Sequence, residues 1–301
     1  VSILLIRMRY KDLETEGLRT NNSIVTNYLA EAENSMGAAA GDWSNWDDSY
    51  NFLRGENPAF IQENLGNNNL KKLRVNLIAF CGMDGKVKFA RMYDYESDKE
   101  TALPAGFGRM FEPGGLLAPK SDPAWSVSGI VTFDGKPMII AVTPSLGTDG
   151  GGPVAGSVTM GRWLVEKDLN RHLVKSGISV KILATGDALA ENPPGNTVFR
   201  RVNASTAEAF IPLKDLGGAP AGVLRAEMPR PFNLQGLELS WTFTILLLMA
   251  GLVFGACVVY VLERYMLRPL SLLSVHVDYI GRENKISERV SVRGNDELAT
   301  L

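Results

Sequence analysis

The feature that most constrains this chain is an uncharged, mostly apolar run at residues 239–262, between Glu238 and Glu263 near the C-terminal end of the 301 residues. A helix through this run rises about 36 Å, which is enough to cross the ~30 Å hydrocarbon core of a bilayer with some tilt. We therefore predict a transmembrane helix at 237–262, with a large domain on one side of a membrane and a short segment on the other.

Basic residues indicate how the predicted helix is oriented. Only Arg225 and Arg230 occur in the roughly 15 residues before the run, whereas more basic residues follow it. Those that follow are Arg264, Arg268, Arg282, Lys285, Arg289 and Arg293. Because basic residues favour the cytoplasmic side, we expect the segment after the helix in the cytoplasm and the large domain at 8–236 on the outer side of the membrane. The formal net charge of −2 offers no extended basic surface, so nucleic acid is not an expected partner.

The N-terminal residues indicate a second contact with the membrane. Residues 1–6 are apolar and are followed by Arg7, Arg9 and Lys11. Six residues cannot span a bilayer, and a signal peptide carries its charges before the apolar stretch rather than after it. We interpret 1–7 as the end of a first transmembrane helix, with a frayed apolar terminus as the alternative. No disulfide is expected, because Cys81 lies in the large domain and Cys257 in the predicted span.

The pattern of the large domain predicts an α+β fold. Apolar residues at three- and four-residue steps predict one long helix over 13–40, which Gly41-Asp42 should end. Asp42 would cap a short helix that holds the aromatic residues after it, 59–65 would form another helix, and Asn67–Asn69 would form a turn. Asp84-Gly85 and Asp134-Gly135 stand between apolar runs and predict two antiparallel hairpins. Further predicted segments are a glycine loop at 147–156, a helix at 163–175 ending at Gly177, and strands at 157–160, 178–183, 197–202 and 222–228.

The segment after the span has the spacing of a coiled coil. Apolar residues recur at four- and three-residue steps, which is a heptad seam that requires partner helices. The seam residues are Met266, Leu270, Leu273, Val277 and Ile280. Together with Arg268-Pro269-Leu270 near the membrane and Asp296-Glu297-Leu298 further on, it resembles an incomplete HAMP domain at 263–301, a dimeric signal-relay module. An amphipathic helix beside the membrane is the alternative.

Two glycines suggest a contact between copies within the membrane. Gly251 and Gly255 form a small-xxx-small pattern, which lets helix backbones approach closely. Ordinary glycine usage in membrane helices explains the same pattern. A homodimer is therefore an expectation that rests mainly on the predicted coiled coil.

The densest cluster in the chain is aromatic and acidic. It runs Asp42-Trp43-Ser44-Asn45-Trp46-Asp47-Asp48-Ser49-Tyr50. Aromatic side chains in such a cluster either complete a core or form one wall of a binding site. The string resembles the signature of the fourth class of CHASE domains, extracellular sensors that place a long helix before a PAS-like αβ core. The resemblance implies a ligand-sensing dimer anchored in the bacterial inner membrane, with a periplasmic sensor domain at 8–236. It implies no particular ligand.

Candidate ligand-binding residues are four residues of the string and three polar side chains in or just after predicted strands. Arginines are included because a guanidinium binds a carboxylate through two parallel hydrogen bonds, although such arginines often pair with surface carboxylates instead. The candidates are Trp43, Trp46, Asp47, Tyr50, Arg91, Tyr93 and Arg162. We expect them around an apolar pocket near the middle of the sheet, open to a small molecule or a periplasmic protein.

Other chemistry lacks support in the sequence. His172 and His276 have no further histidine or cysteine at metal-ligand spacing, so no metal, cofactor or catalytic residue is expected in this chain. The resemblance implies a cytoplasmic output that synthesises or degrades cyclic-di-GMP (GGDEF/EAL), or a histidine kinase as the alternative. A membrane-anchored periplasmic enzyme that uses Asp47, and a structural module without a ligand, also remain open.

Overall fold

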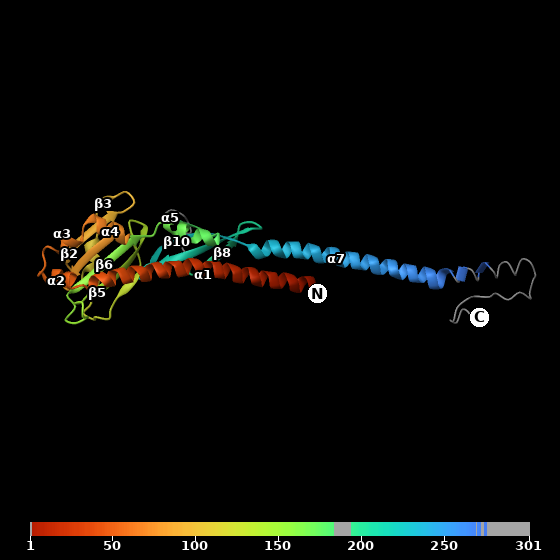
Figure 1. The fold of residues 1–301 in the computed structure, drawn as a ribbon, viewed down its shortest axis with the longest axis horizontal. Helices are drawn as coiled ribbons and strands as arrows, with labels where there is room; N and C mark the ends of the chain where they lie inside the picture. The colour runs from red at the N-terminus through yellow and green to blue at the C-terminus, as the bar shows by residue number, and fades with distance from the viewer. Residues whose placement is uncertain (1, 184–193, 269, 272–273, 276–301) are drawn as a thin grey trace, which may run out of the picture. The chain divides into compact units, whose positions relative to one another are not determined.

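The computed structural model describes residues 2–183, 194–268, 270–271 and 274–275. It divides into a compact unit at Leu5–Leu234, called here the globular unit, and a second unit made of Val1–Leu4 and Gln235–Leu301. The globular unit combines one long helix, short helices and two antiparallel sheets, which confirms the predicted α+β class (Figure 1).

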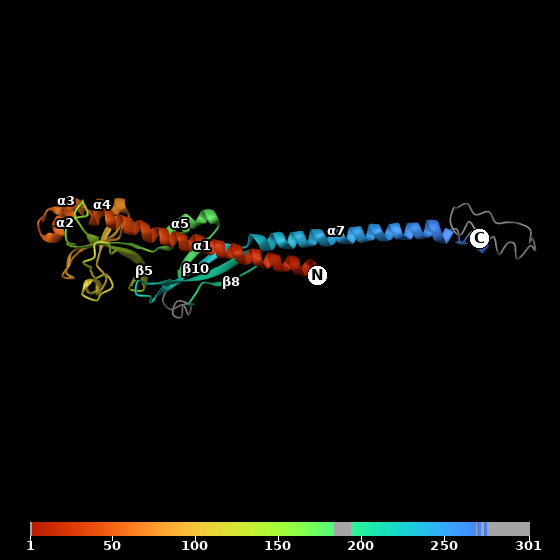
Figure 2. The same ribbon diagram turned by 90° about the horizontal axis from the view of Figure 1, so that it is seen from below.

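The long helix α1 (Ser2–Ser44) lies along both sheets of the globular unit (Figures 1 and 2). Its buried side chains recur at helical spacing and form one stripe that faces the core. The stripe comprises Leu18, Val25, Leu29, Met36 and Ala40. The predicted helix is thus confirmed, and it is longer at both ends than 13–40.

The predicted break at Gly41-Asp42 was wrong, because α1 continues to Ser44 and Asp42 lies inside it rather than capping a new helix. The carbonyl oxygen of Ser44 accepts hydrogen bonds from the backbone N–H of Leu146 at 3.1 Å and from the Ser145 hydroxyl at 2.9 Å. The end of α1 is therefore set by partners about a hundred residues away, which no local pattern reveals.

Three short helices follow α1: α2 (Asp47–Arg54), α3 (Phe60–Asn64) and α4 (Asn67–Leu73). The predicted turn at Asn67–Asn69 was wrong, since these residues begin α4. Helix α4 buries Leu70 in the main core, and the Asn69 side chain donates to the Asn64 carbonyl oxygen at 2.7 Å. Burial of one apolar residue outweighs the weak turn preference of the asparagines.

The first sheet has six strands in the order β3-β2-β1-β6-β5-β4, and every neighbouring pair is antiparallel. Both predicted hairpins are confirmed, and Gly85, Asp134 and Gly135 have the positive φ angles that such turns require. The strands are β1 (Leu77–Gly82), β2 (Val87–Asp94), β3 (Lys99–Thr101), β4 (Val127–Phe133), β5 (Lys136–Ser145) and β6 (Gly156–Trp163). A short 3₁₀ helix, η1 (Phe107–Phe111), packs with the core on the face of this sheet opposite α1.

The second sheet has four antiparallel strands in the order β7-β10-β9-β8. They are β7 (Ser179–Leu183), β8 (Val198–Arg201), β9 (Thr206–Lys214) and β10 (Pro220–Pro229). Strand β9 has no counterpart among the sequence predictions. Helix α5 (Glu166–Leu173) and the 3₁₀ turn η2 (Val174–Ser176) lead into this sheet, so the predicted helix at 163–175 begins three residues later than expected and ends at Gly177 as expected.

The two sheets meet at a close approach between β4 and the turn after β9. Ile130 forms a parallel bridge with Asp215, and its carbonyl oxygen accepts from the Leu216 N–H at 2.9 Å. A Cβ atom on Gly129 would lie 2.5 Å from the Leu216 side chain, so glycine allows this approach. One continuous core connects α1 with both sheets, and displacements in either sheet therefore bear on α1.

Helix α7 (Pro231–Leu262), followed by the π-helical turn η3 (Glu263–Leu267), contains the apolar run. Among the described residues, one helix is long and apolar enough to cross a membrane, at Trp241–Leu267 with a mean hydropathy of 2.7. The side chains of Trp241–Leu267 are exposed. Leu270 is helical, whereas Pro269, Leu273, Val277, Ile280 and Glu297 of the predicted HAMP domain lie outside the described residues.

Candidate functional site

The aromatic residues predicted for the binding site pack against each other and the core. The ring centroid of Trp43 lies 5.7 Å from that of Trp46 and 6.5 Å from that of Phe60. Phe60 continues the cluster to Phe80 on β1, with ring centroids 5.3 Å apart. These contacts favour a structural role at the far end of α1, which was the other interpretation of the string.

Asp47 and Tyr50 hold the glycine loop in place. The Asp47 carboxylate accepts a hydrogen bond from the Thr148 N–H at 2.8 Å, and the Tyr50 hydroxyl donates to the Pro153 carbonyl oxygen at 3.1 Å. Both side chains therefore fasten the loop between β5 and β6 to the start of α2. Neither of these hydrogen bonds involves another of the candidate residues.

Arg91 and Tyr93 lie on β2 and have partners of their own. Arg91 donates to the Leu65 carbonyl oxygen and pairs with Glu100 at 3.4 Å. The Tyr93 hydroxyl donates to the Asp98 carboxylate, and this hydrogen bond, aided by burial, raises the pKa of Tyr93 to about 12. The structure thus places six of the seven candidates in local contacts and does not gather them into one pocket.

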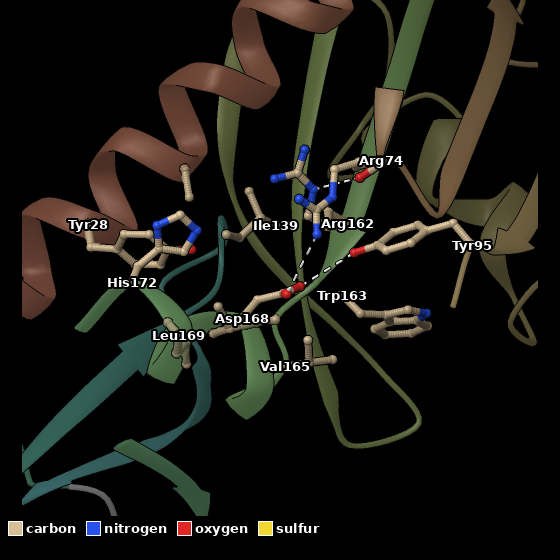
Figure 3. A pocket seen from close by; sticks show the side chains of 12 residues that line it. Tyr28, Arg74, Tyr95, Ile139, Arg162, Trp163, Val165, Asp168, Leu169 and His172 are labelled. Carbon is tan, nitrogen blue, oxygen red and sulfur yellow. Dashed lines mark hydrogen bonds and ion pairs between the residues drawn. The ribbon is translucent and has the colours of Figure 1, made fainter. Parts of the chain in front are cut away.

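Arg162, the seventh candidate, lines a cleft of about 50 Å³ between α1, the first sheet and α5 (Figure 3). It extends from β6, and the facing side chains come from segments far apart in the sequence. The cleft is lined by Tyr28, Ala32, Arg74, Tyr95, Ile139, Arg162, Trp163, Leu164, Val165, Asp168, Leu169 and His172.

Asp168 on α5 is the acidic group of the cleft. Its carboxylate lies 3.2 Å from a guanidinium nitrogen of Arg171 and 3.9 Å from one of Arg74, and it accepts a long hydrogen bond of 3.4 Å from the Tyr95 hydroxyl. Two cations and one donor thus surround Asp168, and Figure 3 shows its contacts with Arg74 and Tyr95. Its negative charge is largely balanced within the protein.

Arg162 has fewer partners within the protein than Asp168. Its Nε donates to the Arg74 carbonyl oxygen at 2.7 Å, which brings the two arginines together at the cleft. Its terminal guanidinium nitrogens have no hydrogen bond or ion pair with any residue that the structure describes. These nitrogens are not buried, so they are hydrated in the free protein and can donate to a bound group.

Two tyrosines add neutral donors to the cleft. Burial, followed by the negative charge of Asp168, raises the pKa of both Tyr28 and Tyr95, and Arg162 and Arg74 partly oppose this. Both hydroxyls therefore stay protonated at neutral pH. The Tyr28 ring also lies against His172, with ring centroids 4.9 Å apart, so α1 and α5 contact each other at the cleft.

Most of the remaining lining is apolar and comes from α1, β5, β6, α5 and the two residues between β6 and α5. Ile139, Leu164 and Leu169 are buried and belong to the main core. A volume of about 50 Å³ accommodates roughly three to five water molecules, well below the hundreds of cubic ångströms of a drug-sized site. The cleft thus combines a cationic edge with a small apolar interior.

A second hollow lies near the loop after η1. It has a volume of about 460 Å³ and is wide open to solvent. Its lining includes Asn45, Trp125, Thr143 and Asp149, with no basic side chain among its residues. None of the sequence candidates lines it.

Sequence reasoning found Arg162 and missed the groups that surround it. Tyr28, Arg74, Tyr95 and Asp168 are each separated from the next by at least 21 residues, and no spacing rule joins them. Arg74 has a positive φ of 53° at the end of α4, but this conformation is not encoded by a glycine or asparagine. Within the described residues, no group of acidic, histidine or cysteine side chains has metal-binding geometry.

Comparisons with known proteins place these features in a family. The family model of the CHASE4 domain matches residues 28–182, which include α1 from Tyr28 onward, the first sheet and α5. The methanogenesis regulatory histidine kinase FilI of Methanothrix harundinacea is 28% identical over 278 residues, which is 91% of this chain and 31% of FilI. The chain therefore spans about a third of the length of that relative.

Solved structures show a more distant likeness. The extracellular domain of histidine kinase vpHK1S-Z8 matches with a TM-score of 0.48 and 12% identity, over 75% of this chain and 94% of that one. A domain of a sensory box/GGDEF family protein from Vibrio parahaemolyticus matches with a TM-score of 0.46 and 11% identity, over 73% and 97%. The family match covers more than half of the sequence, and this chain belongs to the CHASE4 domain family.

Proposed function

We propose that this CHASE4 sensor domain is the input of a membrane receptor whose cytoplasmic output is a histidine kinase. The proposal is supported by the similarity to FilI, which extends over 91% of the chain. The sequence resemblance alone favoured an output in cyclic-di-GMP turnover, with a histidine kinase as the alternative, and the similarity to FilI is the reason for preferring the kinase here. We place the globular unit on the outer side of the membrane, because the basic residues follow the apolar run.

The observation that carries the proposal is a buried ion pair at the start of α7. Glu14 on α1 accepts from Arg230 Nε at 2.5 Å and from Arg201 at 2.8 Å, and the Glu14 and Arg230 side chains are only 8% and 5% exposed. Arg230 also donates to the Asn203 carbonyl oxygen, and the next residue, Pro231, begins α7. This ion cluster connects α1 to the residue that leads into the predicted span.

Separating the buried pair of Glu14 and Arg230 is energetically costly. Removing one partner of a buried pair leaves an uncompensated charge and costs about 3–5 kcal/mol. When α1 moves, Arg230 therefore moves with it. Because α1 also packs against both sheets, a change at either sheet is passed through α1 to the entry of α7.

The competing functions have less support. An enzyme built on Asp47 would need that carboxylate free for a substrate, whereas it accepts a hydrogen bond from Thr148 and fastens a loop. A purely structural module would need no cleft with unpaired arginine donors. The sensor role accounts for both the cleft and the ion pair.

The proposal is tested by joining residues 1–301 to the part of FilI that follows the matched region, and measuring autophosphorylation in membranes. We expect kinase activity from the fusion and a clear change in its rate on Glu14→Gln. Glu16→Gln is the matched control, since Glu16 is exposed on the same helix. An inactive fusion, or equal rates for the two variants with equal folded amounts, would contradict the proposal.

A further inference from the structure

We propose that the cleft at Arg162 binds a small monocarboxylate of about two to four carbon atoms, and that this is the signal of the sensor. The inference rests on the proposed function and deepens it by naming a ligand class. It is carried by four properties of the cleft: unpaired cationic donors, neutral hydroxyl donors, apolar walls and a small volume.

The charge of the cleft favours an anion. Asp168 already lies between Arg171 and Arg74 and receives the Tyr95 hydroxyl. Arg162 has only a backbone carbonyl oxygen as its partner, at 2.7 Å from Nε. A carboxylate on the terminal nitrogens of Arg162 completes the pairing, and the planar guanidinium fits its two oxygens.

The walls favour a carboxylate with a short alkyl tail over an inorganic oxyanion. Ile139, Leu164 and Leu169 line the cleft with apolar surface, and this surface offers nothing to the oxygens of phosphate or sulfate. A methyl or ethyl group there removes apolar area from water. The volume of about 50 Å³, roughly three to five water molecules, sets the upper size of the ligand.

The position of the cleft explains how such a ligand would act. Tyr28 belongs to α1, Arg162 to the first sheet, and Asp168 and His172 to α5. Helix α5 is in turn bound to the second sheet, because Asn170 exchanges hydrogen bonds with the backbone of Val180 at 2.7 and 2.9 Å. A ligand here contacts the three elements whose relative position determines where Glu14 and the end of β10 lie.

The test is titration of the chain in detergent micelles with sodium acetate, propionate and butyrate, at constant ionic strength, with heat of binding and melting temperature as readouts. The free amino acid alanine and inorganic phosphate are titrated in the same way for comparison. A ligand that binds only the folded state raises the melting temperature as its concentration exceeds the dissociation constant. We expect saturable binding of at least one monocarboxylate and none of phosphate.

Three variants locate the binding. Arg162→Gln removes a charged donor and should raise the dissociation constant about ten- to a hundredfold. Ala32→Leu fills the cleft from α1 without changing its charge and should weaken binding while the protein stays folded. Arg54→Gln is the matched control, because Arg54 is half-exposed and pairs with Glu56 outside the cleft.

Other outcomes overturn the inference. Binding of alanine without propionate would show a zwitterion site, with an ammonium group on Asp168. Binding of phosphate alone, or monocarboxylate binding unaffected by Ala32→Leu and Arg162→Gln, would also refute it. If no carboxylate binds while kinase output still depends on Glu14, the ligand inference fails and the proposed function stands. If a monocarboxylate binds while kinase output does not depend on Glu14, the ligand inference stands and the proposed function fails.

Discussion

At the scale of single residues, buried charge is placed where elements must stay together. Glu208 on β9 is 2% exposed and accepts two hydrogen bonds each from Arg200 on β8 and Arg225 on β10. One carboxylate thereby connects three strands of the second sheet. Its counterpart Glu14 connects α1 with the same sheet.

Replacing Glu208 by Gln should destabilise the protein by about 2 kcal/mol. The full cost of breaking a buried pair is reduced here, because the Arg200 and Arg225 side chains are 61% and 39% exposed and regain water. Thermal unfolding of the chain in micelles, followed by tryptophan fluorescence, measures the loss. Glu16→Gln, at an exposed position on α1, is the control, and equal losses in the two variants would contradict the assignment.

The Glu208 carboxylate should make the stability of the protein depend on pH. Burial raises the pKa of Glu208, but the hydrogen bonds from Arg200 and Arg225 outweigh this and hold it below 4.5. A group with a lowered folded pKa contributes stability above its unfolded pKa and loses that contribution as pH falls through the folded value. The stability difference between wild type and Glu208→Gln should be constant from pH 5 to 8 and shrink below about pH 4.5. A difference that grows with acid would refute the direction.

At the scale of elements, sequence patterns correctly predicted those structures that depend on interactions between neighbouring residues. Asp84-Gly85 and Asp134-Gly135 specify tight turns by themselves, and both hairpins formed as expected. Strand β9 was missed because Ala207, Ala209 and Pro212 give its sequence little strand preference. It is stabilised by its neighbours β8 and β10 and by the Glu208 ion pairs, which are tertiary. The cleft was missed because the residues that line it are brought together only by tertiary contacts.

The pairing of β6 with β1 requires a glycine at position 156, and a substitution can test this requirement. A Cβ atom there would lie 2.1 Å from the Cys81 carbonyl oxygen, where β6 pairs with β1. Because backbone atoms of a central strand cannot move away cheaply, Gly156→Ala should cost about 3 kcal/mol. Gly151→Ala in the preceding loop meets no atom within 4 Å and should be nearly neutral. Similar melting temperatures for the two variants would show that the strand pairing is wrong.

At the scale of the whole molecule, the expected homodimer is a proposal that concerns α7. A Cβ atom on Gly251 or Gly255 meets nothing within 4 Å in the described chain, so no internal packing requires these glycines. If they form a contact between copies, Gly251→Ile with Gly255→Ile should reduce energy transfer between labelled chains in micelles. Val253→Leu with Val259→Leu is the control. Equal transfer in both pairs of variants would exclude the glycines as the contact.

The whole-molecule account depends on Glu14 and Arg230 acting as one unit that couples the globular unit to α7. The most direct measurement is a double-mutant cycle of Glu14→Gln and Arg230→Gln in the kinase fusion, read as autophosphorylation rate. The account predicts that the double variant changes the rate no more than either single variant, because each already breaks the same connection. Additive effects of the two substitutions would contradict it, since the residues would then act independently.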